Sequence, residues 1–177
     1  MSQKLKAWNK PHHPKTSAQD FRTPAYLIHF LKQRFGDNFV DAAFNPNKDN
    51  ATSETFDLWG DKNPKGWIYI NPPWDTPNVI KFVTKAKEWA NQGHRIVFLL
   101  PVKLTERKWV DQINPHLDHI IILGGRINFE GPNTVKAGAT RWGCFFGIMD
   151  ETANYSSIKT FESITLAELK RNYLTYL

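Results

Sequence analysis

The chain has 177 residues, of which 41% are hydrophobic and 14% aromatic, and its formal net charge is +6. This length and composition indicate one folded domain and exclude a disordered chain, and no apolar run approaches the roughly 20 residues of a membrane span or forms the core of a secretory signal. The one cysteine, Cys144, excludes an intramolecular disulfide and a cysteine-based zinc site, and we expect it to be buried in a protein of the reducing cytoplasm.

The first predicted helix follows a basic arm. Residues 1–20 are polar, basic and proline-bearing, which predicts a flexible segment. In the sequence DFRTPAYLIHFLKQRFG, we expect Thr23 to be the N-cap and Pro24 the first helical residue. Gly36 is expected to end this helix.

Two strands are predicted next, with a long connection between them. The segment 38–43 reads as a short buried strand. Residues 45–66 are rich in Asn, Asp, Gly and Pro, which predicts a loop. WIYI, residues 67–70, predicts the second strand, and it runs directly into the sequence NPPW.

The middle of the chain alternates helix, strand and helix. Thr76 is expected to cap a second helix, with Pro77 as its first residue and Gly93 as its end. The following segment 95–101, RIVFLLP, is almost uniformly apolar, as is typical of a strand buried on both faces of a parallel sheet. A shorter helix is then expected, with Thr105 as its cap.

The last third predicts a strand, a hairpin and a terminal helix. The segment 118–125 reads as a further parallel strand. The segments 126–131 and 141–149 are expected to pair as a hairpin around a long loop. A capping box, T-x-x-E, opens a terminal helix over residues 165–176.

This alternation predicts an open α/β sheet, mostly parallel, that ends in an antiparallel hairpin. Residues 21–177 are expected to form a single domain, and a monomer is favoured. Ligands in open α/β sheets bind at the carboxyl ends of the strands. Asp41, Asn71 and Pro101 are expected at those ends.

The basic residues point to a polyanionic partner, with a solvated basic surface as the alternative. They gather in three groups among aromatic residues, a combination that suits nucleic acid because cations bind phosphates and flat rings stack on bases. The aromatic residues are Trp8, Trp109, Phe129 and Trp142. The basic groups are Lys4, Lys6, Lys10, Lys15 and Arg22, then Lys103, Arg107 and Lys108, and finally Arg126, Lys136 and Arg141.

The sequence Asn71-Pro72-Pro73-Trp74 is the strongest chemical signal. Proline fixes its own φ and forces the preceding residue into an extended conformation, so the amide of Asn71 and the carbonyl of Pro72 can converge on one point. Two acceptors suit a group with two hydrogens, such as an exocyclic amine, and Trp74 offers a face for a planar ring. The alternative is a tight turn with Trp74 in the core.

These residues resemble the amino-methylating DNA methyltransferases, which carry an (Asn/Asp/Ser)-Pro-Pro-(Tyr/Phe/Trp) motif. More narrowly, residues 20–148 resemble the phage-type DNA adenine-N6-methyltransferases of the Dam group. The matching positions are Arg22-Thr23-Pro24 with Leu27, Asp41-Ala42-Ala43, Asn71 to Trp74, Leu100-Pro101, Thr105 with Trp109, and GGRINFEGP at 124–132.

The resemblance implies a reduced Rossmann-like methyltransferase fold and methylation of the N6 amine of adenine in DNA, with S-adenosylmethionine as cofactor. The implied catalytic residues are Asn71, Pro72, Pro73 and Trp74. Asn71 and Pro72 would hold the amine, and Trp74 would stack on the base after it flips out of the duplex. The amine nitrogen would attack the methyl group in line, with no metal ion and no covalent intermediate. The implied cofactor residues are Thr23, Pro24, Asp41, Ala42, Asp57 and Asn71.

We expect no separate target-recognition domain, so DNA contact must come from the arm, from the hairpin and loop at 126–142, and from the segment 103–109. The residues expected to bind DNA are Lys103, Arg107, Lys108, Arg126, Lys136 and Arg141.

The segment after Asp41 departs from the family pattern, because DAAFNPNKDN lacks a glycine-rich turn. The carboxylate that binds the cofactor ribose therefore stays open among Asp41, Asp49, Glu54 and Asp57. Two alternatives to adenine methylation also stay open. One is methylation of the N4 amine of cytosine, and the other is a non-catalytic nucleic-acid-binding protein on a degenerate methyltransferase fold.

Overall fold

The computed structural model describes residues 22–43, 54–60, 63–129, 139–150 and 160–176. The predicted arm, residues 1–20, lies outside the described residues. Within the described part of the chain, none of the helices has the length and apolar character needed to cross a membrane.

The described strands form one sheet in the order β2-β1-β3-β4-β6-β5-β7. Four of its neighbouring pairs are parallel, and β6 runs antiparallel to both β4 and β5. The strands are β1 (Phe39–Asp41), β2 (Glu54–Thr55), β3 (Trp67–Ile70), β4 (Ile96–Pro101), β5 (His119–Gly124), β6 (Cys144–Met149) and β7 (Thr160–Thr165). The predicted fold class, an α/β sheet that is mostly parallel with antiparallel pairing, is confirmed and is compatible with a Rossmann-like methyltransferase fold.

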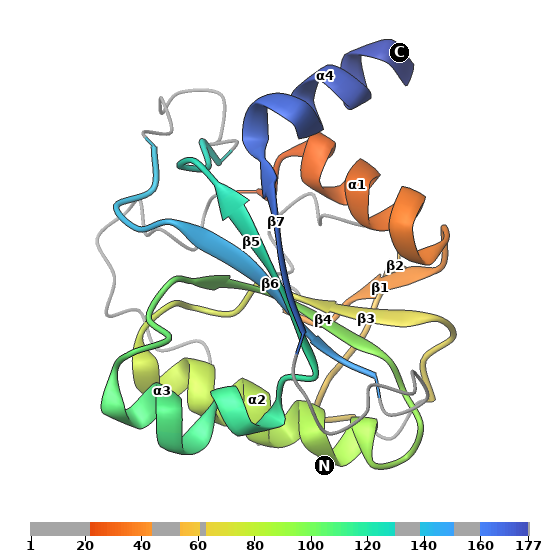
Figure 1. Cartoon of the computed structure of the whole chain (residues 1–177). Coiled ribbons are helices and arrows are strands. Elements are labelled where there is room, and N and C mark those ends of the chain that lie inside the picture. Colours follow the sequence, from red (N-terminus) through yellow and green to blue (C-terminus); the bar gives the residue numbers. More distant parts are fainter. Residues whose placement is uncertain (1–21, 44–53, 61–62, 130–138, 151–159, 177) are drawn as a thin grey trace, which may run out of the picture.

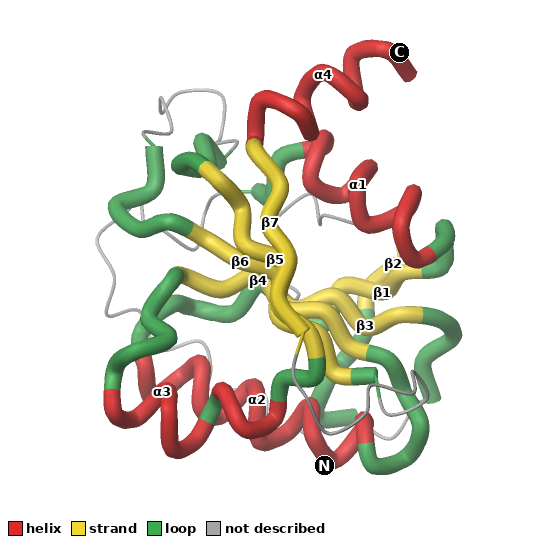
Figure 2. The backbone as a smooth tube through the Cα atoms, in the orientation of Figure 1, coloured by secondary structure: helices red, strands yellow, loops and turns green. Residues whose placement is uncertain are grey.

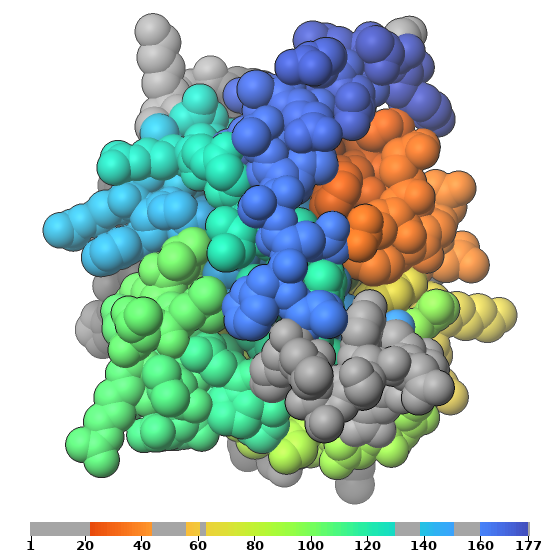
Figure 3. Space-filling view, viewed as in Figure 1, coloured from red at the N-terminus to blue at the C-terminus, as the bar shows by residue number. Residues whose placement is uncertain are grey.

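Helices cover both faces of the sheet and make three layers (Figures 1 and 2). The helices are α1 (Ala25–Phe35), α2 (Thr76–Ala90), α3 (Arg107–Gln112) and α4 (Leu166–Tyr176), with a short 3₁₀ helix, η3 (Asn114–His116), after α3. The pair α1 and α4 lies on one face, and α2 and α3 lie on the other. In the space-filling view of Figure 3, β7 and α4, in blue, run beside α1, in orange.

The hydrophobic core is divided by the sheet into two clusters. Because side chains alternate along a strand, Trp67 and Tyr69 of β3 pack toward α1, and Ile68 and Ile70 pack toward α2. Every residue of β4 is buried, as its apolar sequence predicts. Cys144 is fully buried as predicted, and burial raises the pKa of its thiol to about 12.

Three predicted helix caps are wrong, each by one residue. Helix α1 begins at Ala25 with Pro24 at the N-cap position, and the hydroxyl of Thr23 contacts Tyr69 instead of the helix. Asp75 caps α2, because its carboxylate accepts the Asn78 N–H at 3.0 Å, and Thr76 is the first helical residue. Helix α3 begins at Arg107, so Glu106 and not Thr105 takes the N-cap position.

The predicted hairpin is also wrong. Of segment 126–131, the structure describes residues 126–129, and these contribute one isolated bridge, Asn128 to Ala139. Strand β6 instead lies between β4 and β5 and pairs with both. All residues of β6 are buried, which suits a central strand rather than the arm of a hairpin.

Other segment boundaries differ in smaller ways. The strand expected at 38–43 is shorter and covers β1 alone, while β2 and β7 were not expected. Strand β7 has polar residues, but its Glu162 binds Arg34 of α1 and the Nε2 of His119 on β5. The capping box of the terminal helix is confirmed, because the N–H of Glu168 donates to Thr165 Oγ1 at 3.2 Å.

Replacement of Gly66, just before β3, should lower the stability of the fold more than replacement of an ordinary turn glycine. Its φ is +88°, and a Cβ there would lie 2.9 Å from the carbonyl carbon of Asn38, in the neighbouring chain segment, and closer still to its oxygen. Gly93 has a similar φ of +85° with open space around the position, so it is a matched control. Gly93→Ala should lower the free energy of unfolding by roughly 1 kcal/mol for backbone strain, and Gly66→Ala by about 1–3 kcal/mol more because of the clash.

Denaturant unfolding of the two variants and the wild type measures this difference. Equal losses in the two variants would show that the approach of Asn38 to Gly66 is not close.

Candidate functional site

The candidate site lies where the direction of strand order reverses. From β1 the chain passes to β2 on one side and then returns to β3 on the other side of β1. Ligands of open α/β sheets bind outside the carboxyl ends of the strands at such a switch point. Asp41 ends β1 and Asn71 follows β3, so the fold brings these two predicted residues to neighbouring strand ends.

The side-chain amide of Asn71 is held at both ends. Its Nδ2 donates to the hydroxyl oxygen of Thr23 at 3.3 Å, and its Oδ1 accepts the indole N–H of Trp74 at 3.1 Å. An indole nitrogen can only donate, so the reverse orientation of the amide would set two donors against each other. The orientation of Asn71 is therefore fixed by its neighbours, and Oδ1 keeps one further lone pair.

A buried tyrosine stands behind this arrangement. The hydroxyl of Tyr69 lies 2.8 Å from Thr23 Oγ1, which continues the hydrogen-bonded chain from Asn71 into the core. Burial raises the pKa of the Tyr69 hydroxyl well above its ordinary value, although the bond to Thr23 acts in the opposite direction. The hydroxyl therefore stays protonated at neutral pH, and it is available as a donor to Thr23.

Trp74 is half-buried and tied to two strands. Its indole N–H also approaches the backbone carbonyl of Leu99 on β4, at 3.3 Å. Its ring meets the ring of Phe129 edge to face, with centroids 5.5 Å apart and planes at 68°. Of the two prolines, Pro72 is buried and Pro73 is half-buried. Trp74 packs against the core cluster on the α1 side, as the alternative of a tight turn with Trp74 in the core expects, but part of the indole stays accessible.

The predicted cofactor residues divide into two groups. Thr23 and Pro24 are buried beside Asn71, and Thr23 uses its hydroxyl to hold the Asn71 amide. Asp41 is also buried, with 7% of its surface exposed, and its Oδ1 accepts the N–H of Ala43 at 3.0 Å. The N–H of Ala42 is bonded to the carbonyl of Tyr69.

Asp57 is exposed and lies close to the end of β1. It forms an isolated bridge with Ala43, and its Oδ1 accepts the N–H of Trp59 at 3.0 Å. Of the other two candidate carboxylates, Glu54 lies in β2 and Asp49 lies outside the described residues. Asp41 and Asp57 are therefore the two candidates that the described structure brings to the switch point.

Several of the predicted DNA-binding residues lie at the same edge of the sheet. Lys103 follows β4, Arg126 follows β5, and Arg141 precedes β6. Because β6 is antiparallel to its neighbours, its start lies beside the ends of β4 and β5. Arg107 and Lys108 are exposed on α3, where Arg107 lies 3.7 Å from Asp111. Lys136 lies outside the described residues.

Two aromatic residues of the predicted nucleic-acid surface have opposite environments. Trp109 is fully buried, and its N–H points to Thr76 Oγ1 at 3.4 Å, so its assignment to that surface is wrong. It fills the core between α3 and the sheet. Trp142 is 44% exposed, and the cations of Lys103 and Arg141 lie 5.6 and 5.5 Å from its ring centroid. Trp8 lies outside the described residues.

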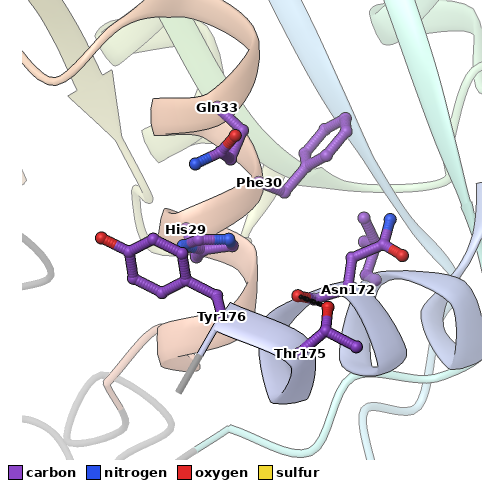
Figure 4. Close-up of a pocket in the computed structure, with 7 residues that line it drawn as sticks. His29, Phe30, Gln33, Asn172, Thr175 and Tyr176 are labelled. Atoms are coloured by element: carbon purple, nitrogen blue, oxygen red, sulfur yellow. Dashed lines mark hydrogen bonds between the residues drawn. The ribbon is translucent and has the colours of Figure 1, made fainter.

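A groove of about 370 Å³ lies elsewhere, between α1 and α4 (Figure 4). None of the predicted site residues lines it. The residues labelled in the figure come from α1 (His29, Phe30 and Gln33) and from α4 (Asn172, Thr175 and Tyr176).

Tyr69 is the member of this site that was not predicted from the sequence. A signal for it exists, because side chains two residues apart on a strand point to the same face. Tyr69 and Asn71 are related in this way, and Thr23 lies on that same face, just before α1. A polar hydroxyl in the otherwise apolar WIYI strand is thus explained by its contact with Thr23.

Comparison with known proteins gives one family match. The family model described as DNA N-6-adenine-methyltransferase (Dam) matches residues 10–172. No curated protein and no solved structure matches the chain.

Proposed function

The chain belongs to the DNA N-6-adenine-methyltransferase (Dam) family, and we propose that it methylates the target amine at the Asn71–Trp74 turn with S-adenosylmethionine as donor. Its activity is the methylation of adenine in DNA at N6. The observation that carries the proposed site is the fixed amide of Asn71, whose oxygen accepts from Trp74 at 3.1 Å while its nitrogen donates to Thr23.

The amide oxygen of Asn71 can accept one hydrogen of the adenine amine through its remaining lone pair. The carbonyl of Pro72 is the second acceptor in this proposal. An aromatic amine is a weak nucleophile because its lone pair is delocalised into the ring. Acceptors on both amine hydrogens favour a pyramidal nitrogen with a localised lone pair, so the contribution of Asn71 and Pro72 is positioning and electrostatic.

Trp74 has two roles in this proposal. Its exposed surface stacks on the flipped adenine, and its N–H holds the oxygen of Asn71 in place. The edge contact with Phe129 keeps the indole in one orientation and supports both roles.

The residues at the switch point fit a cationic, hydroxyl-bearing cofactor. S-adenosylmethionine supplies an electrophilic methyl group on a sulfonium centre when it is bound. Asp41 and Asp57 offer carboxylates at adjacent strand ends, and carboxylates accept hydrogen bonds from ribose hydroxyls and attract an ammonium group. Because Asp57 is the exposed one, we assign the ribose to Asp57. Trp59, which has an exposed ring, follows Asp57 by two residues in the chain.

Thr23 and Pro24 were expected to line the cofactor pocket, together with Ala42. Their position next to Asn71 is compatible with that role, and it stays a prediction. The contacts of Thr23 favour a second role, which is to hold the Asn71 amide.

DNA would be held by the basic residues at the same edge of the sheet, within a single domain of residues 21–177. Arg126 and Arg141 are exposed, and Lys103 is half-buried beside them in the fold. Their proposed partners are phosphates, which bind cations regardless of sequence.

Incubation with a labelled methyl donor and plasmid DNA, followed by nucleoside analysis, tests the proposed function. Label should appear in N6-methyladenine. Label in N4-methylcytosine would show that cytosine is the base methylated. DNA that stays unlabelled would favour a non-catalytic nucleic-acid-binding protein.

Asn71→Ala should abolish most methyl transfer and largely keep cofactor binding, because the other implied cofactor residues remain. Loss of one preorganised hydrogen-bonding group typically lowers kcat by roughly 10²–10³-fold. Asn71→Asp is the matched variant, because one carboxylate oxygen still accepts from Trp74 and the hydroxyl of Thr23 can turn to donate to the other. We expect Asp to retain more activity than Ala.

Thermal shift with S-adenosylmethionine is the control, since a ligand that binds the native state raises its apparent stability. Both Asn71 variants should show the wild-type shift. A near wild-type rate of methylation by Asn71→Ala would show that Asn71 does not bind the adenine amine.

Replacement of Trp74 separates its two proposed roles. Phe keeps a ring for stacking but lacks the N–H that holds Asn71, whereas Ala lacks both. We therefore expect methylation rates in the order wild type, Trp74→Phe, Trp74→Ala, measured under single-turnover conditions on one DNA. A Phe variant equal to wild type would exclude the orienting bond, and one equal to Ala would exclude stacking.

A further inference from the structure

Trp142 combines an exposed indole with a rigid backbone. The side chain is 44% exposed. Its own carbonyl accepts the hydroxyl of Thr140 at 2.8 Å, and the carbonyl of Gly143, the next residue, accepts the N–H of Val102 at 2.8 Å. The indole is therefore exposed on a backbone segment that two hydrogen bonds anchor.

The surroundings of Trp142 are cationic and come from two separate segments. The ammonium group of Lys103, after β4, and the guanidinium group of Arg141, before β6, both lie within 6 Å of the ring centroid, at 5.6 and 5.5 Å. Glu106 lies 3.6 Å from Lys103 and offsets part of this charge. The two cations provide charge for phosphates, and the exposed part of the Trp142 ring provides surface for a base.

Trp142 is also linked to the candidate active site through short contacts. The N–H of Thr140 donates to the carbonyl of Ile127 at 2.8 Å, and Asn128 and Ala139 form a bridge. The next residue, Phe129, meets the ring of Trp74. One pair of backbone segments therefore supports both the wall of the amine site and the exposed indole.

We propose that Trp142 is a stacking platform for an unpaired DNA base next to the target adenine, with Lys103 and Arg141 holding the flanking phosphates. This inference rests on the proposed function and names a second contact of the same DNA. When a base leaves the duplex, its partner and neighbours lose a stacking surface, and an exposed indole at the rim of the site can replace it.

Equilibrium binding of fluorescent DNA to the full chain tests this proposal without relying on catalysis. Three probes are compared: a single strand, a fully paired duplex, and the same duplex in which an adenine next to the target adenine lies opposite an abasic position. Loss of one base–aromatic stack lowers affinity by roughly 10-fold, so Trp142→Ala should show this loss on the first and third probes and a much smaller one on the paired duplex.

Matched variants separate the contribution of the Trp142 ring to DNA affinity from the contributions of apolar bulk and of charge. Trp142→Tyr should bind nearly as wild type, while Trp142→Leu, which keeps apolar bulk without a ring, should bind as weakly as Ala. Phe161→Ala removes another exposed aromatic residue, 60% exposed on β7, and should change nothing. Lys103→Ala and Arg141→Ala should each lower the salt dependence of binding by about one unit of slope, and the Trp142 variants should not.

Wild-type affinity of the Leu variant for the probe with the unpaired adenine would overturn the proposal. An equal loss on all three probes would also overturn it, since stacking on an unpaired base would then not be the cause. Methylation by the wild type is measured in parallel. If the wild type does not methylate DNA but shows this binding pattern, the proposed function is rejected and the stacking role of Trp142 stands. If the wild type methylates DNA but lacks this binding pattern, the stacking role is rejected and the proposed function stands.

Discussion

The candidate active site depends on the hydrogen bonds that the indole N–H of Trp74 donates. This N–H points at the amide oxygen of Asn71, 3.1 Å away, and at the carbonyl of Leu99, 3.3 Å away. Since Leu99 belongs to β4 and Asn71 follows β3, this one donor ties the turn to two neighbouring strands. The proposed acceptor of the amine is thus oriented in the free protein, and preorganisation of this kind lowers the reorganisation that catalysis requires.

The start of α1 is adapted to the same purpose. A Thr before a helix usually caps it, and such a cap stabilises by about 1 kcal/mol. Here the hydroxyl of Thr23 contacts Tyr69 and Asn71 instead, and α1 begins without a side-chain cap. Pro24 reduces the loss, because its ring sets the backbone angle of the helix start and it has no N–H that needs a partner. The Thr23 hydroxyl therefore fixes the position of the Asn71 amide, and helix α1 lacks the stabilisation of a side-chain cap.

The sequence predicts the parts of the fold that local patterns determine. Strongly apolar strands such as β3 and β4, and the turn after β3, follow from their residues alone. The position of β6 between β4 and β5 does not, because pairing between distant segments leaves no local signal. Strand β7 is hidden by its polar sequence, and its Glu162 contacts Arg34 and His119, which are far away in the chain. Thr23 was assigned by a local rule, and a tertiary contact with Tyr69 overrides it.

The antiparallel direction of β6 brings the proposed DNA-binding residues beside the proposed catalytic turn. A parallel strand at this place would begin at the opposite edge of the sheet, and the residues before it would lie far from Asn71. Because β6 is reversed, the segment 139–143 lies beside the ends of β4 and β5, where Phe129 contacts Trp74. Amine recognition and the proposed base platform of Trp142 can then share one edge, so a separate recognition domain is not required to bring them together.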